Sequence, residues 1–179
     1  MSYPMRSYYY EDGLETERLM TRKLIYEDYK LWAPFFDDPE AIRFFPFLKP
    51  TSSEERAIDW IQKQLDRYRE QRYGMHALFE KKSGEFIGLC GLLLQDIHGT
   101  LELEVGYSIL KKHWRKGFAT EAAIRFKEFG FAHDQAESII SIIDVNNIGS
   151  QKVALNNGMV RDYQTVWHDM NVYIFRARP

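Results

Sequence analysis

Apolar and polar residues alternate along residues 100–110, which is the pattern of a strand with one buried face and one polar face. The apolar positions are Leu101, Leu103, Val105, Tyr107 and Ile109, and the polar positions are Glu102, Glu104, Gly106 and Ser108. Further strands are predicted at residues 18–25, 74–81, 85–97 and 138–145, with one or two more within residues 161–177. The nearly continuous isoleucine run within 138–145 predicts a central strand covered on both faces.

Apolar residues at helical spacing predict helices between these strands. The clearest helix lies within residues 51–71, where Ser52 and Glu55 form a capping box. The other helices are expected at residues 26–36, where Pro34 starts to disturb the helix, at 118–133, and at 148–157, which Asn157-Gly158 ends.

The order of elements predicts the fold class. Three consecutive strands joined by short turns, from residue 74 to residue 110, indicate an antiparallel meander. The strand–helix–strand unit over residues 101–145 should form a parallel, right-handed crossover. A mixed α/β fold with one mixed sheet is therefore expected.

Length and composition narrow the class of protein further. A chain of 179 residues suits one domain, and residues 1–12 are expected to form a loose N-terminal arm. The formal net charge of −2 gives no basic field for binding nucleic acid or an anionic membrane. No secretory signal and no membrane-spanning apolar run is visible. The single cysteine, Cys90, is read as a small buried hydrophobe and favours a reducing compartment, so a cytoplasmic location is predicted.

The stretch "HWRKGFATEA" (113–122) places two cations, a glycine and small residues where a helix should begin. The first N–H groups of a helix lack partners within the helix and carry partial positive charge. Gly117 allows close backbone approach, and Arg115 and Lys116 add charge, so this turn is a candidate cradle for an anion such as pyrophosphate. A solvated strand-to-helix turn is the alternative interpretation.

Four segments in order resemble the GNAT superfamily of acyl-CoA-dependent N-acyltransferases, and most closely its branch of Rim-type ribosomal-protein N-terminal acetyltransferases. These segments are "LETERLMTRKL", "DDPEAIRFF", "LEVGYSILKKHWRKGFATEA" and "DVNNIGSQKVALNNGM". The resemblance covers nearly the whole chain. Two positions depart from the wider superfamily: Trp114 stands at a Gln/Arg position, as is common in the Rim-type branch, and Ala154 stands where many members carry a tyrosine acid.

The resemblance implies a site for acetyl-CoA. The strands ending near Leu110 and Val145 would splay apart, with pantetheine lying between them like an added strand. The implied binding residues are Ile109, Leu110, Arg115, Lys116, Gly117, Phe118, Ala119, Thr120, Asn147 and Ser150. Asn147 would bond to the pantetheine arm and Ser150 would face the thioester. Read from the residues alone, Asn147 is equally a helix N-cap and Ser150 a residue of the first helical turn.

Transfer to an amine needs a base, a donor for the developing oxyanion and a source of protons for the thiolate. Glu104 is the candidate base, acting through water in a wet, shallow site, although an ordinary exposed strand carboxylate is the alternative and Glu102 fits that alternative better. The resemblance implies a backbone N–H near Ile109 as the oxyanion donor. Ser150 is a weak candidate acid acting through water, unless solvent protonates the thiolate. The histidines show no metal-ligand spacing, so no metal is predicted.

The chain is therefore predicted to be an acetyl-CoA-dependent N-acetyltransferase that acts by direct attack in a ternary complex. Its acceptor is expected to be a primary amine, either the N terminus of a ribosomal or other protein or a small amine such as an antibiotic or polyamine. A catalytically silent CoA-binding module is the third possibility, because Ala154 replaces the usual phenol. Neither a membrane nor a nucleic acid is expected as a partner, and a homodimer is left open.

Overall fold

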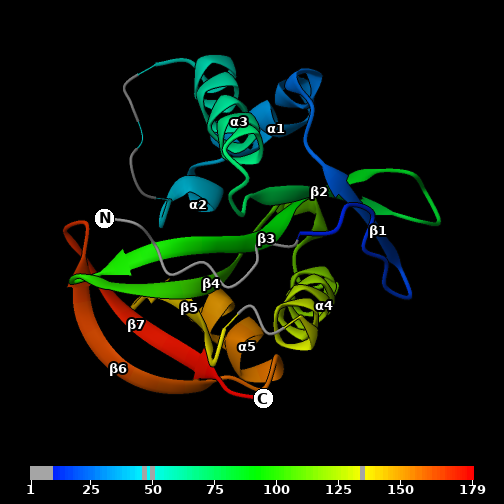
Figure 1. Ribbon diagram of the computed structural model, residues 1–179. Coiled ribbons are helices and arrows are strands. Elements are labelled where there is room, and N and C mark those ends of the chain that lie inside the picture. The colour runs from blue at the N-terminus through cyan, green and yellow to red at the C-terminus, as the bar shows by residue number, and fades with distance from the viewer. Residues whose placement is uncertain (1–9, 46–47, 49–50, 134–135) are drawn as a thin grey trace.

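The computed structural model describes residues 10–45, 48, 51–133 and 136–179 (Figure 1). Residues 1–9 of the expected N-terminal arm lie outside the described residues. Tyr10 departs from that expectation, because its side chain is buried. The Tyr10 hydroxyl donates to the Gly74 carbonyl at 2.7 Å and accepts from the Leu92 N–H at 2.9 Å. The end of the arm is thus fixed to the sheet.

A seven-stranded mixed sheet with the order β1-β2-β3-β4-β5-β7-β6 forms the centre of the fold. The strands are β1 (Leu19–Lys23), β2 (Met75–Glu80), β3 (Phe86–Ile97), β4 (Thr100–Ile109), β5 (Ile139–Asp144), β6 (Val160–Trp167) and β7 (Met170–Ala177). All neighbouring strands are antiparallel except β4 and β5, which are parallel. The predicted meander and the predicted parallel unit are both confirmed.

Helices cover both faces of the sheet. The helical segments are η1 (Tyr26–Asp28), α1 (Tyr29–Asp37), α2 (Pro39–Ile42), α3 (Ser53–Arg69), η2 (Lys111–His113), α4 (Phe118–Ala132) and α5 (Ile148–Asn156). Figure 1 shows α1, α2 and α3 on one side of the sheet and α4 and α5 on the other. One core packs α4 and α5 against β3, β4 and β5, and another packs α1 and α3 against β2 and β3. Cys90 is fully buried in the first of these, as predicted.

Local signals set several helix ends. In the capping box of α3, the Glu55 N–H donates to Ser52 Oγ at 3.1 Å and the Ser52 N–H donates to Glu55 Oε2 at 2.9 Å. After α5, Gly158 takes a φ of +75°, which a glycine adopts without the steric cost of a side chain. Helix α1 continues through Pro34 to Asp37, because its buried aromatic face packs against α3 and outweighs the lost backbone hydrogen bond.

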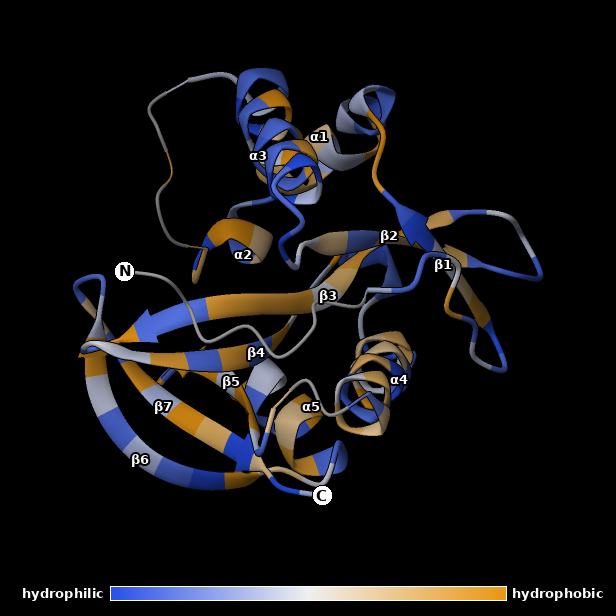
Figure 2. Ribbon diagram, viewed as in Figure 1, coloured by the Kyte–Doolittle hydropathy of each residue, from blue (hydrophilic) through white to orange (hydrophobic). Residues whose placement is uncertain are grey.

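Strand β4 differs from its prediction in one respect that matters for the site. Its polar face was expected to face water, with Glu102 as the most exposed carboxylate. Instead, Glu104 is only 8% exposed, and Glu102 bonds to Arg176 at 2.9 and 3.0 Å. The reason is tertiary, because Gln95, Ile142 and Arg176 of other strands bond to these two carboxylates. Figure 2 shows the contrast with β6, where hydrophilic residues recur along an exposed edge strand.

Candidate active site

Strands β4 and β5 pair over only two positions, Leu103 with Ile139 and Glu104 with Ile140. One side chain extends this contact, because Ser141 Oγ donates to the Val105 carbonyl at 2.8 Å. Beyond these contacts both strands continue, β4 to Ile109 and β5 to Asp144, but their described pairing does not. The two strands therefore separate toward their carboxyl ends, as the resemblance implied.

The edge of β4 that faces this gap presents backbone polar groups. Peptide groups of alternate residues in a strand point to opposite neighbours. Leu110 donates to Ile87 of β3, so Tyr107 and Ile109 direct their N–H and C=O groups to the β5 side. The Ile109 carbonyl accepts the indole N–H of Trp114 at 2.7 Å. The Tyr107 peptide groups and the Ile109 N–H remain along the gap.

The turn between η2 and α4 forms a compact concave backbone. Gly117 is the N-cap of α4 with a φ of +82°, and Arg115 also takes a positive φ of 61°. No side chain caps the first turn of α4. The N–H groups of Phe118, Ala119 and Thr120 are thus left for an external acceptor. Arg115 and Lys116 are exposed beside them, so the residues of the predicted cradle do come together.

His113 lies buried beneath this turn. Its pKa is lowered, first by burial and then by the charges of Lys112 and Lys116. The imidazole therefore adds little positive charge to the turn. The groups that could attract an anion there are the backbone N–H groups and the exposed side chains.

The start of α5 lies across the gap from β4. Asn147 is its N-cap, with Oδ1 accepting the Ser150 N–H at 3.1 Å, so the capping interpretation of Asn147 is confirmed. Ser150 is partly buried in the first turn. The Tyr107 hydroxyl donates to the Ser150 carbonyl at 2.9 Å and ties β4 to α5. Ala154 is fully buried, so the position of the missing phenol belongs to the core.

Glu104 sits at the point where β4 and β5 separate. Its carboxylate accepts a hydrogen bond from Gln95 Nε2 at 2.7 Å and another from the backbone N–H of Ile142. Burial raises its pKa, while these two hydrogen bonds and the charge of Arg67 act in the opposite direction. The alternative interpretation of Glu104 as an ordinary exposed strand carboxylate is wrong, because its side chain is buried. An enclosed carboxylate with a raised pKa is a better proton acceptor than an exposed one.

Three neighbours of Glu104 were missed in the sequence. Gln95 carried a usable signal, because the β3–β4 hairpin pairs it with Glu102 and makes it a diagonal neighbour of Glu104. Ile142 acts through its backbone and carries no sequence signal. Arg67 comes from α3, and only the packing of that helix brings it near.

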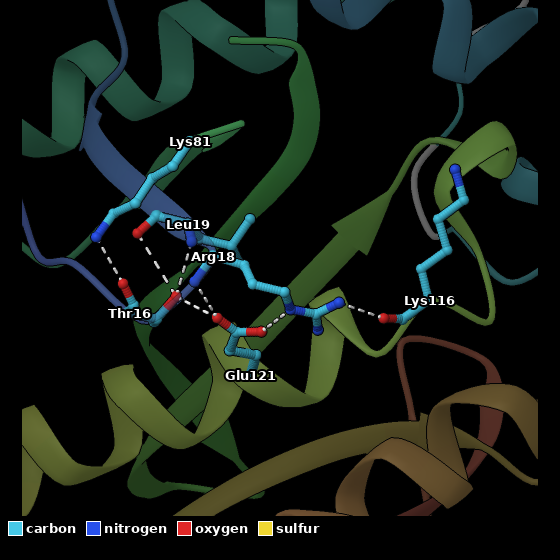
Figure 3. A network of polar contacts seen from close by, with 6 residues as sticks. All are labelled: Thr16, Arg18, Leu19, Lys81, Lys116 and Glu121. Carbon is cyan, nitrogen blue, oxygen red and sulfur yellow. Dashed lines mark hydrogen bonds and ion pairs between the residues drawn. The ribbon is translucent and has the colours of Figure 1, made fainter. Parts of the chain in front are cut away.

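A second group was also missed, and it lies beside the cradle. Figure 3 shows Thr16 and Arg18, just before β1, meeting Glu121 in the first turn of α4. Burial alone would raise the pKa of Glu121, but hydrogen bonds from Thr16 and Arg18 outweigh it and lower that pKa. The segment just before β1 is therefore anchored to the first turn of α4 and to the turn before that helix.

The described part of the chain lacks two other features, a metal-ligand cluster and a membrane-spanning helix. No group of three or more His, Cys, Asp or Glu side chains there could hold a metal ion. None of the described helices has the length and apolar character that a membrane crossing requires.

Comparison with known proteins adds an independent observation. The family described as "Acetyltransferase (GNAT) domain" matches residues 18–160. The protein named uncharacterized N-acetyltransferase p20 of Bacillus licheniformis is 31% identical over 171 residues, covering 92% of this chain and 94% of its own.

Solved structures share the fold. An acetyltransferase of Agrobacterium tumefaciens superposes with a TM-score of 0.78 at 21% identity, covering 99% of this chain and 100% of its own. RimL, a ribosomal L7/L12 α-N-protein acetyltransferase solved with coenzyme A, has a TM-score of 0.77 at 11% identity, covering 93% of this chain and 98% of its own.

Proposed function

Because the chain belongs to the GNAT family of acetyltransferases and is an N-acetyltransferase, we propose that it transfers an acetyl group from acetyl-CoA to a primary amine by direct attack in a ternary complex. The observation that carries this proposal is the gap between β4 and β5, which opens after two residue pairs next to the uncapped start of α4. A polar edge and a concave row of N–H groups there suit an amide chain linked to a pyrophosphate.

The proposed binding residues for the pyrophosphate belong to the turn before α4 and to the first turn of α4. Gly117 fits this role, because a Cβ there would meet only Arg18 Nη2, at 3.2 Å, while its φ disfavours any side chain. The cradle residues are Arg115, Lys116, Gly117, Phe118, Ala119 and Thr120. Asn147 has used Oδ1 for capping, which leaves its Nδ2 group for the pantetheine arm. Ile109, Leu110 and Ser150 would line the thioester end.

We assign the role of base to Glu104. It accepts a proton from the acceptor ammonium, directly or through one water, and the freed nitrogen attacks the acyl carbon supplied by acetyl-CoA. The N–C bond forms and the C–S bond breaks. The Ile109 N–H would donate to the acyl oxygen while this happens. The thiolate takes its proton from solvent or from Ser150 through water.

For the acceptor, we propose the N-terminal amine of a protein, as in the Rim-type branch that the four sequence segments resemble. RimL shares the fold of this chain, so its structure supports the proposed acceptor through the common architecture alone. A small amine is the competing acceptor.

We also propose that residues 1–179 form a single acetyltransferase domain that works in the cytoplasm, since the one cysteine is buried and unpaired.

One experiment tests this function in two stages. First, CoA at a hundredfold excess over its dissociation constant should stabilise the fold by about 2.7 kcal/mol, seen as a higher melting temperature. Second, thiol release from acetyl-CoA should be measured with N-terminal peptides, small amines and no acceptor. Release with peptides alone supports the proposed acceptor, and release with small amines alone overturns it. Binding of CoA without any acceptor-dependent release would indicate a silent CoA-binding module.

A further inference from the structure

We propose that Arg18 is a positioning residue for the pyrophosphate cradle, because it fixes the peptide between Lys116 and Gly117 in one orientation. This inference rests on the proposed function, since it concerns the same cofactor site. Arg18 lies 98 residues before Lys116 in the chain.

The contact acts on one peptide group. Arg18 Nη1 donates to the Lys116 carbonyl at 2.9 Å (Figure 3). The described chain has no cis peptide bond, and in a planar trans peptide the C=O and the following N–H point in opposite directions. Because the Lys116 carbonyl points toward Arg18, the Gly117 N–H points away from Arg18. It therefore lies on the side of the turn opposite Arg18, and this is the side to which we assign the anion.

This peptide needs an external constraint. It joins Lys116 to Gly117, and Lys116 itself lies between two residues with positive φ, Arg115 at 61° and Gly117 at 82°, so the turn conformation is uncommon. Glycine alone adopts several backbone conformations at similar cost. Without the bond to Arg18, rotation of the 116–117 peptide would direct a carbonyl oxygen toward the anion in place of an N–H.

Arg18 is itself rigidly held. Its Nε donates to Glu121 Oε2 at 2.6 Å, and its backbone N–H donates to Glu121 Oε1 at 2.8 Å. The hydroxyl of Thr16 donates to the same oxygen, Oε1. The guanidinium also lies 4.6 Å from the centre of the Phe118 ring. Glu121 and Phe118 both belong to α4, so Arg18 links the first turn of that helix to the loop before it.

The planar guanidinium is what makes this link possible. It donates at once to a carboxylate and to a carbonyl in fixed directions, which a lysine ammonium on a flexible stem cannot reproduce. Its charge is largely offset by Glu121 at 2.6 Å, so its main effect on the site is expected to be geometric.

The test compares the dissociation constant of CoA in the wild type and in Arg18→Ala, Arg18→Lys and Lys81→Ala, by calorimetry. Loss of a hydrogen bond from a charged group predicts roughly tenfold weaker binding for Arg18→Ala. Arg18→Lys should bind several-fold more weakly than the wild type, because one ammonium cannot hold both partners. In steady-state assays, the KM for acetyl-CoA should rise while kcat at saturation and the KM for the amine stay near wild type.

Lys81→Ala is the matched control. Lys81 bonds to the Thr16 carbonyl and to Glu15, both at 2.7 Å, so it anchors the same segment without touching the turn. Its variant should bind CoA normally. If the wild type binds no CoA, the proposed function fails. If the wild type binds CoA and Arg18→Ala and Arg18→Lys bind it equally well, the proposed role of Arg18 is wrong. Equal weakening by Lys81→Ala would also overturn it, because general loosening of the segment would then be the cause. Should Arg18→Ala not fold, Arg18→Lys decides.

Discussion

Two glutamates on one face of β4, two residues apart, have opposite surroundings. Glu102 meets a buried arginine, Arg176, which also bonds to Asp162 at 2.6 Å and to Ser138 at 2.7 Å. Glu104 meets the neutral donors Gln95 and Ile142 at the point where the sheet opens, with the charge of Arg67 acting more weakly. The first region is closed by opposite charges, and the second holds a carboxylate whose proton affinity is increased. Partners, and not residue type or strand position, separate a structural carboxylate from a candidate base.

Glu104→Gln should have the largest effect. It keeps the size of the side chain but removes the capacity to accept a proton, so kcat should fall by roughly 10²–10⁴-fold at neutral pH. CoA affinity should barely change, and raising the pH should restore part of the rate, because more of the amine is then deprotonated. Rate measurements across pH, with calorimetry for CoA, check this. An unchanged kcat would exclude Glu104 as the base, and a parallel loss of CoA binding would make it structural.

Glu102→Gln should lower the stability of the fold and leave the catalytic rate unchanged. Arg176 would keep Asp162 but lose two charged hydrogen bonds, so the free energy of unfolding should fall by roughly 1–3 kcal/mol. The pKa of Arg176 is raised chiefly by its hydrogen bond to Glu102, which marks this pair as the main contact. Urea denaturation measures the loss, and kcat should stay at the wild-type value. A large fall in kcat without loss of stability would remove the distinction between the two glutamates.

Gln95→Leu should have a moderate effect on the pH profile. The Gln95 amide favours the charged form of Glu104, so its removal should raise the pKa of Glu104 further. The decrease of kcat/KM on the acidic side should occur at higher pH. At pH values below this decrease, the rate should be roughly three- to tenfold lower than that of the wild type. At pH values well above this decrease, the rate should approach that of the wild type. A uniform loss at every pH would show that Gln95 acts only on structure.

The smallest expected effect is a change in how the free energy of unfolding depends on pH. Burial raises the pKa of Glu104 in the folded state, so the folded protein binds this proton more tightly than the unfolded chain does. The free energy of unfolding therefore falls as the pH rises from the unfolded value through the folded one. Glu104→Gln lacks this loss, so its stability relative to wild type should increase as the pH rises above the unfolded pKa of Glu104.

Glu121 is the control of opposite sign for this measurement. Hydrogen bonds from Thr16 and Arg18 lower its pKa despite burial. Its contribution to stability is present above the unfolded pKa and is lost as the pH falls through the folded one. Glu121→Gln should therefore lose stability relative to wild type as the pH rises over the acidic range. If both variants changed in the same direction, global charge would explain the trend better than these two sites.

Local signals predicted most of the fold. The capping box at Ser52 and Glu55, the glycine after α5 and the alternation in β4 each depend on a few neighbouring residues, and each marks a helix end or a strand that is present. Pro34 shows the limit of such signals, because packing keeps α1 helical past it.

The site was less predictable, because it depends on contacts between distant segments. Placing Glu104 on the face opposite Tyr107 was correct, but whether that face is wet depends on the layer packed over it. Arg67 and Arg18 act across helix packing and across about a hundred residues of chain, which no local pattern records. The backbone N–H of Ile142 is independent of its side chain and is visible only in three dimensions.

The short seam between β4 and β5 has a consequence for how the molecule opens. Two paired positions and side-chain bonds of Ser141, Glu104 and Glu102 join a four-stranded sheet, β1 to β4, to a three-stranded one, β5, β7 and β6. We expect two parts that share so few backbone hydrogen bonds to exchange their amide hydrogens as separate cooperative units. A ligand lying in the seam would bridge them. When CoA is added, hydrogen exchange should therefore become slower at the amides of β4, β5 and β7 together. The two parts would then open in one cooperative event and not in two.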